Sequence, residues 1–134
     1  MRYMLDTDIC IYVINERPAN VLQVFRDHEG AGLGISAVTA GELLYGVART
    51  GSQRNLKALR QFLARLDIAP YDQAAAEVFG SLRAWLASQG TPIGPYDTQI
   101  AAHAHCLGVT LVTNNVREFS RVPGLHVENW ADAR

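Results

Sequence analysis

Residues 95–113 read PYDTQIAAHAHCLGVTLVT, and this stretch decides the class of the fold. Its first part predicts a helix that begins at Pro95 and ends at Gly108, because proline suits the first position of a helix and glycine suits its end. The next five residues, Val109 to Thr113, are mostly β-branched or apolar and predict a buried strand. A helix that leads directly into a buried strand is typical of a parallel sheet covered by helices.

The rest of the chain continues this alternation. Short apolar runs predict strands at 3–5, 33–35 and 125–127. Apolar residues at helical spacing, together with capping residues, predict helices at 8–14, 18–30, 36–49, 53–66, 72–88 and around 118–119. We therefore expect an α/β fold with a parallel sheet covered on both faces. In such folds ligands bind beyond the carboxyl ends of the strands.

The composition is that of one globular domain spanning residues 1–134. The 12 basic and 13 acidic residues give a net charge of −1, which excludes a polybasic protein. Cys10 and Cys106 lie in apolar stretches, and we interpret them as buried free thiols in a reducing compartment. No apolar run is long enough to span a membrane, and Asp6 comes too early for a signal peptide, so we expect a cytoplasmic protein.

Four acidic residues fall at the carboxyl edge of the expected sheet: Asp6, Glu42, Asp97 and Glu118. Asp97 shares the inward face of its helix with Ile100, Ala101 and Ala104, so we expect it to be buried and to need a partner. A structural role is also open for each acid. Asp97 can interact favourably with the start of its helix, and Glu118 can be a surface acid beside arginines.

Helix capping is the structural alternative for the two acids nearer the N-terminus. Asp6 can cap the helix that follows it, although we expect Asp8 to form that cap. Glu42 completes a capping-box pattern with Thr39, but Ser36 is the better candidate for that cap and leaves Glu42 in the second turn.

Carboxylates gathered in one place raise one another's pKa unless a cation lies between them. The single lysine, Lys57, is distant in sequence from all four acids. Oxygen ligands without cysteine or paired histidine favour Mg²⁺ or Mn²⁺ over Zn²⁺. His103 and His105 point about 200° apart around their helix, so they cannot bind one ion together, and we expect them to be half-buried or exposed. Such a site suits phosphoryl or phosphodiester chemistry.

Four short motifs occur in order: MLDTDI at 4–9, GEL at 41–43, PIGPYDTQIA at 92–101 and LVTNNVREF at 111–119. The chain then ends with VPGL at 122–125 and ENW at 128–130. Together these motifs resemble the PIN-domain ribonucleases and, within them, the VapC toxins of bacterial VapBC toxin–antitoxin pairs. The resemblance covers essentially the whole chain. It implies a single PIN domain at 1–134 with a PIN-like three-layer α/β/α sandwich.

The resemblance also implies an endoribonuclease that cuts tRNA or rRNA, depends on Mg²⁺ with Mn²⁺ as a substitute, and is inhibited by a VapB-type antitoxin. The implied catalytic acids are Asp6, Glu42, Asp97 and Glu118, of which the first three hold the metal. Thr113 matches the hydroxyl beside these acids, and Thr7 assists. Many PIN domains have an aspartate where this chain has Asn115, which puts a second metal in doubt.

The same resemblance implies a homodimer and a bound antitoxin. The helices around 44–45 and 56–62 are candidate surfaces for both, and an antitoxin arginine can reach the acids. Four of the 13 acids belong to the site, which leaves nine against 12 basic residues and a surface that tolerates RNA. Arg54, Lys57 and Arg65 share one helical face and are our candidates for phosphate contacts, with a solvated outer face as the alternative.

Three other kinds of protein are alternatives to a PIN-domain ribonuclease. A haloacid-dehalogenase phosphatase also begins with Asp-x-Asp, but Cys10 stands where that family has threonine or valine, and its downstream lysine is missing. A response-regulator receiver needs a lysine after its last strand, and this chain has none there. A catalytically weak PIN module that only binds RNA or a partner is the third alternative.

Overall fold

Five short strands form one parallel sheet in the order β3-β2-β1-β4-β5. The structure, a computed structural model, describes residues 1–132. Within them the strands are β1 (Tyr3–Leu5), β2 (Leu33–Ser36), β3 (Asp67–Ala69), β4 (Thr110–Val112) and β5 (Val127–Glu128). The central strand β1 has β2 on one side and β4 on the other, so the strand order reverses at β1. A parallel sheet leaves room for a ligand at such a reversal.

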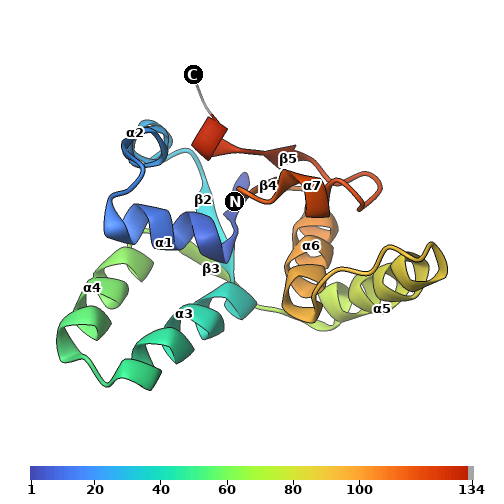
Figure 1. Cartoon of the computed structure of the whole chain (residues 1–134), viewed down its shortest axis with the longest axis horizontal. Helices are drawn as coiled ribbons and strands as arrows, with labels where there is room; N and C mark the ends of the chain where they lie inside the picture. Colours follow the sequence, from blue (N-terminus) through green and yellow to red (C-terminus); the bar gives the residue numbers. More distant parts are fainter. Residues whose placement is uncertain (133–134) are drawn as a thin grey trace.

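Helices cover both faces of this sheet (Figure 1). They are α1 (Thr7–Asn15), α2 (Ala19–Asp27), α3 (Ala37–Thr50), α4 (Gln53–Leu63), α5 (Gln73–Ser88), α6 (Pro95–Leu107) and α7 (Val116–Phe119), with a final 3₁₀ turn at Trp130–Asp132. As the sequence predicts, α6 begins at Pro95 and ends before Gly108, which adopts a left-handed conformation with φ of 67°. None of the helices in residues 1–132 is long and apolar enough to cross a bilayer.

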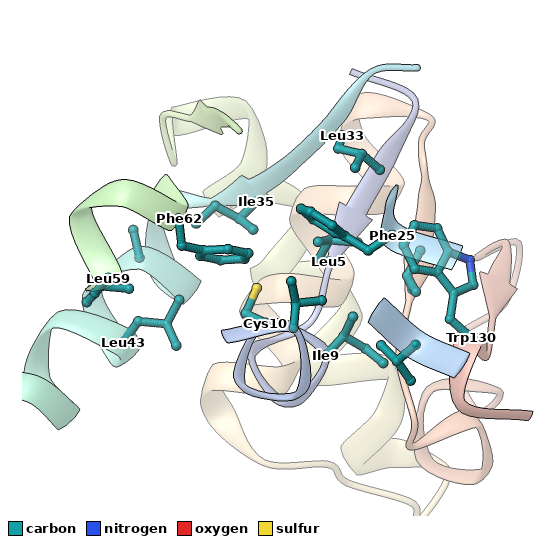
Figure 2. Close-up of a cluster of buried hydrophobic side chains, with 14 residues drawn as sticks. Leu5, Ile9, Cys10, Phe25, Leu33, Ile35, Leu43, Leu59, Phe62 and Trp130 are labelled. Atoms are coloured by element: carbon teal, nitrogen blue, oxygen red, sulfur yellow. The ribbon is translucent and has the colours of Figure 1, made fainter. Parts of the chain in front are cut away.

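Neighbouring residues of the central strands point to opposite faces and divide the core in two. Met4 of β1 and Leu111 of β4 pack with α6 and α7, whereas Leu5 and Val112, one position further along, pack with α1 to α4. Figure 2 shows this second cluster, in which the side chains of all four helices meet the sheet. The predicted α/β class and three-layer arrangement are confirmed.

The observed elements differ from the predicted ones at β3 and at several boundaries. The apolar spacing of residues 53–66 predicts a helix to residue 66 and no strand after it. In the structure α4 ends at Leu63 and β3 follows. This three-residue edge strand is largely exposed, so it carries no alternating apolar signal. The second helix ends at Asp27 rather than Gly30, and the last strand is Val127–Glu128 rather than 125–127. Both predicted free cysteines are free, although Cys106 is only half-buried.

Gly34 of β2 is a position where the sheet leaves no room for a side chain. An added Cβ lies 2.7 Å from the carbonyl oxygen of Asp67 in β3 and also meets the side chain of Met1. Met1 can move, but the backbone of β3 cannot move without loss of its pairing. We predict that Gly34→Ala lowers the free energy of unfolding, measured by urea denaturation, by about 1–3 kcal/mol.

The matched control for this prediction is Gly80→Ala in the middle of α5. No atom lies within 4 Å of a Cβ added there. This control is expected to raise the free energy of unfolding by about 0.5–1 kcal/mol, because alanine is the better helix former. A Gly34→Ala protein as stable as the parent would contradict the close approach of β3 to β2.

Candidate active site

Asp6 is the buried centre of the site, where β1 ends. Its Oδ1 accepts a hydrogen bond from the backbone N–H of Thr7 at 2.7 Å, and its Oδ2 accepts one from the hydroxyl of Thr113 at 2.8 Å. Asp6 is 4% exposed and Thr113 is fully buried. Asp6 is also the N-cap of α1, whereas Asp8 lies exposed in the first turn, so the prediction that Asp8 forms this cap is wrong.

Glu42 faces Asp6 from the second turn of α3. Its Oε1 accepts a hydrogen bond from the hydroxyl of Thr7 at 2.8 Å. Ser36 forms the N-cap of α3 and accepts from the backbone N–H of Val38 at 3.0 Å, so the capping-box alternative for Glu42 does not apply. Thr7 therefore contacts both carboxyl groups, Asp6 through its backbone and Glu42 through its side chain.

Asp97 and Glu118 approach from the other side of β1. Asp97 lies half-buried in the first turn of α6, and Glu118 lies in α7. Glu118 Oε2 accepts a hydrogen bond from the side-chain amide of Asn115 at 2.7 Å, and Glu118 Oε1 accepts a longer one from the backbone N–H of Gly94 at 3.4 Å. The carboxyl group of Asp97 also lies close to Gly94, so Asp97 and Glu118 are neighbours at the start of α6.

One continuous path of hydrogen bonds joins three of the acids. It runs from Glu42 through Thr7, Asp6, Thr113 and Asn115 to Glu118. The connection in its middle is the backbone N–H of Asn115, which donates to the hydroxyl of Thr113 at 2.9 Å. Asp97 lies beside Glu118 at the end of this path. The structure thus brings together all seven residues that the sequence analysis assigns to the site.

The electrostatics of this group favour a positive charge between the acids. Burial raises the pKa of Asp6 from 3.8 to about 6, and the charges of Asp8 and Glu42 add to this effect. Burial, the charge of Asp6 and the charge of Glu118 raise the pKa of Asp97 from 3.8 to about 7. The one ion pair within residues 1–132 joins Arg65 to Glu29, so none of the four acids has a basic partner there. A proton or a cation has to compensate their charge.

The chemistry of the donors fits Mg²⁺ or Mn²⁺, because carboxylate and hydroxyl oxygens are the only side-chain donors in the cluster apart from the Asn115 amide. In the part of the chain that the structure describes, no three His, Cys, Asp or Glu side chains stand close enough to hold a metal ion as they are. Mutual repulsion keeps ionised carboxylates apart, and a divalent cation reverses that force. The charge and the donor type therefore fit such a cation, while the ligand positions are not preassembled.

The predicted RNA-binding stripe carries none of the seven site residues. Arg54 and Lys57 are exposed on α4, which borders the groove that reaches Thr7 and Glu42. Arg65 is already engaged, because its guanidinium pairs with Glu29 at 2.6 Å and lies 5.0 Å from the centre of the Phe25 ring. Contacts of this stripe with RNA stay a prediction.

Two side chains that the sequence analysis does not assign to the site lie next to it or behind it. Tyr12 of α1 accepts a hydrogen bond from the side chain of Asn114 at 3.0 Å, one residue beyond Thr113. His103 of α6 is 1% exposed, so the expectation that it is half-buried or exposed is wrong, whereas His105 is exposed as expected. The alanines on both sides of His103 were the available signal for its burial.

The chain is similar in sequence and structure to known proteins. The family model described as PIN domain matches residues 3–125. A Shigella flexneri protein named tRNA(fMet)-specific endonuclease VapC is 46% identical over 132 residues, covering 98% of this chain and 99% of the relative. Ribonuclease VapC2 of Haemophilus influenzae is 44% identical, covering 97% and 98%. A chain in the crystal structure of DNA-bound VapBC from Salmonella typhimurium superimposes with a TM-score of 0.89 at 42% identity, covering 97% and 98%.

The raised pKa values of Asp6 and Asp97 predict how stability depends on pH when no divalent cation is present. Between about pH 4 and pH 7 these carboxyl groups ionise in the unfolded chain but keep their protons in the folded one. The folded state then binds more protons, so the free energy of unfolding falls as the pH rises through this window. Asp97→Asn removes one of these titrations, and its melting temperature in EDTA should exceed that of the parent at pH 8 and approach it at pH 4.

Asp8→Asn is the matched control, because Asp8 is an exposed acid in the first turn of α1. Its melting temperature should stay close to that of the parent across the pH range, because burial is the main cause of the raised pKa of Asp6 and the charge of Asp8 is a smaller one. Thermal melts of the three proteins at several pH values make the comparison. Parallel curves for Asp97→Asn and the parent would show that burial does not raise the pKa of Asp97.

Proposed function

The chain belongs to the PIN-domain family and, within it, to the VapC ribonucleases, and from this premise we propose that it is the toxin of a toxin–antitoxin pair that cuts RNA with the help of a divalent cation. The observation that carries the proposal is the hydrogen-bonded path that brings Asp6, Glu42 and Glu118 together, with Asp97 beside them, without a basic partner. Such a cluster has a net negative charge that only a cation or protons compensate. Phosphodiester hydrolysis is a reaction that a cation in this position supports.

In this mechanism Asp6, Glu42 and Asp97 hold Mg²⁺, for which Mn²⁺ substitutes. The bound ion lowers the pKa of a water molecule and balances charge that develops on the phosphate. Asp6 is the ligand whose orientation is fixed, because Thr7 and Thr113 each occupy one of its oxygens and leave the remaining lone pairs for the cation. Thr7 also orients Glu42.

Glu118 takes a supporting role in the same mechanism. Its Oε2 is engaged by the Asn115 amide, and its carboxyl group faces Asp97. Because Asn115 is neutral and its amide is used in this way, the position offers less negative charge than an aspartate would. We therefore propose one strong cation site and, beside Glu118, at most a weak second one.

The RNA that we propose as the substrate is the initiator tRNA. Relatives from Shigella flexneri and Salmonella typhimurium, 46% and 42% identical along nearly the whole chain, carry the name tRNA(fMet)-specific endonuclease VapC. Ribosomal RNA is the second candidate, since relatives with the general name ribonuclease are similar to the same extent. With a tRNA as substrate, the cytoplasm is the compartment in which the protein acts.

A partner of the VapB type fits a groove between α1, α3 and α4. The groove has a volume of about 350 Å³, and its lining runs from Ile11, Ala58 and Leu59 to Thr7 and Glu42. Solved relatives are VapBC complexes, which supports an antitoxin as the occupant. A segment lying in this groove ends beside the acids, where an arginine side chain can pair with them.

We also propose that the chain forms a homodimer. Of the surfaces that the sequence analysis proposes, Leu44 and Tyr45 are 41% and 65% exposed and available to a partner. Phe62 is 4% exposed and belongs to the core, so the segment 56–62 offers less surface than expected.

The alternative of a PIN module that only binds RNA is disfavoured by the four acids that the site retains. An Asp-nucleophile phosphatase is disfavoured by Asp6 itself, because both of its oxygens already accept hydrogen bonds. No lysine lies beside it to support the phosphate, since the chain has one lysine and it is on α4.

Asp97→Asn tests the proposed role of the acids. The change keeps the size of the side chain, but it removes the charge that holds the cation. With initiator tRNA and saturating Mn²⁺, we expect the initial cleavage rate to fall at least ~100-fold. Glu118→Gln should have a smaller effect, and EDTA should abolish cleavage by the parent until Mn²⁺ is restored.

Asp8→Asn serves again as the matched control and should keep its rate within about threefold, since Asp8 only favours the start of its helix. Asp97→Asn with the activity of the parent, or undiminished cleavage in excess EDTA, would require the nuclease mechanism to be withdrawn. Cleavage of ribosomal RNA in preference to initiator tRNA would leave the mechanism in place and change the substrate.

A tryptophan in the groove tests where the antitoxin binds. Ala58 is exposed and lines the groove on α4, and it does not contact the acids. Ala58→Trp should fill the groove and weaken inhibition by the product of the neighbouring antitoxin gene by at least ~10-fold, while the uninhibited cleavage rate is kept. Gln53→Trp, an exposed position on the outer face of α4, is the control and should be inhibited normally. Equal inhibition of both variants would place the antitoxin elsewhere.

A further inference from the structure

A buried hydrogen bond connects the two helices that carry Glu42 and Asp97. His103 of α6 is 1% exposed, and its Nδ1 lies 2.8 Å from the hydroxyl oxygen of Ser36. Ser36 is fully buried, ends β2 and is the N-cap of α3. The two residues are 67 positions apart in the chain, so this contact is a feature of tertiary structure alone.

The partners of these two side chains define the direction of each hydrogen bond. Ser36 Oγ already accepts from the backbone N–H of Val38 at 3.0 Å, so its own proton is available for His103 Nδ1. The imidazole also packs against the ring of Tyr71, in the loop after β3. A neutral imidazole that accepts at Nδ1 satisfies Ser36. A charged imidazole would direct an N–H at the positive end of the α3 dipole.

His103 is not in contact with the reacting atoms. Its Nδ1 is used by Ser36, and the rings of His103 and Tyr71 make a T-shaped contact with centroids 5.3 Å apart. The contacts of the ring are therefore to the start of α3 and to the loop after β3. His103 can therefore affect the reaction only through the positions of other residues.

The positions of the acids on the two helices indicate what this contact controls. Glu42 follows Ser36 by six residues on α3, and Asp97 precedes His103 by six residues on α6. Six residues correspond to about 9 Å along a helix, so a tilt of about 10° at the contact moves either acid by about 1.5 Å. Displacements of this size are large for a catalytic group, where about 1 Å can cost ~100-fold in rate.

Glu42 is one end of the hydrogen-bonded path through the acids, and Asp97 lies beside its other end at Glu118. No hydrogen bond joins Glu42 directly to Asp97. We propose that His103 is a positioning residue that, through Ser36, fixes the separation of Glu42 and Asp97 and so closes this path into a ring. The proposal rests on the proposed function, since it concerns the cation site of the same acids. Apolar contact of Val38 with the α6 cluster keeps the helices packed when the hydrogen bond is lost.

The test compares His103→Leu with His103→Asn. Leucine fills the space without hydrogen bonds, whereas the carbonyl oxygen of asparagine is bonded to Cγ, as Nδ1 is, and can accept from Ser36. The probe is Mn²⁺ alone, and the free ion is followed by electron paramagnetic resonance during titration of the intact protein. We expect leucine to weaken Mn²⁺ binding about 10-fold, and asparagine to restore most of the loss. With initiator tRNA, kcat should fall for leucine while KM changes little.

Ser36→Ala provides an independent test, because it removes the same hydrogen bond from the α3 side. The double variant with His103→Leu should bind Mn²⁺ no more weakly than the worse single variant, since both changes break one interaction. Val21→Ala, a change in the other core cluster, is the control for lost stability and should leave Mn²⁺ binding unchanged. If His103→Leu does not fold, Ser36→Ala alone tests the contact, because it leaves the buried histidine in place.

The outcomes separate the two proposals. Parent-like Mn²⁺ affinity and kcat in a folded His103→Leu or Ser36→Ala protein would overturn the positioning role. Equal weakening by Val21→Ala would also overturn it, since loss of stability alone would then explain the effect. Failure of the proposed function has a different signature, in which Asp97→Asn binds Mn²⁺ as the parent does and the parent does not cleave RNA.

Discussion

The interaction on which the site depends is the hydrogen-bonded burial of the Asp6 carboxyl group at the end of β1. Burial makes its negative charge costly, and the hydrogen bonds from Thr7 and Thr113 recover part of that cost. The same two threonines extend the network to Glu42 on one side and to Asn115 on the other. The remaining acids thus take their places relative to a group that is itself fixed by the central strand of the sheet.

The parallel sheet explains why these residues meet although they are distant in the chain. Because β2, β1 and β4 are neighbours and point the same way, the segments that leave their carboxyl ends meet above one edge. The alternation of Met4 and Leu5 between the two cores fixes β1 from both sides. The tightly packed central strands therefore lie next to the buried acids. Their packing holds the carboxyl groups together against their mutual repulsion.

The arrangement of α3 and α6 adds a second requirement. Helix α3 carries Glu42 and helix α6 carries Asp97. The buried hydrogen bond between Ser36 and His103 joins these two helices away from the acids. A neutral histidine suits this place, since it accepts from Ser36 without adding charge near the start of α3. The site is then a ring of polar contacts around an uncompensated negative centre, which is the arrangement that a cation stabilises.

The sequence alone determined what depends on neighbours along the chain. Local patterns gave most helices, the central strands, and the acidic residues where the sheet ends, because periodicity and capping are local properties. Tertiary structure decided the rest. The strand β3 exists because Asp67 pairs opposite Gly34, and His103 is buried because the start of α3 packs on it. The N-cap belongs to Asp6 rather than Asp8 because the hydroxyl of Thr113, 107 residues away, holds its carboxyl group at the end of β1. Pairing and burial depend on residues far apart in the chain, and local spacing carries no record of them.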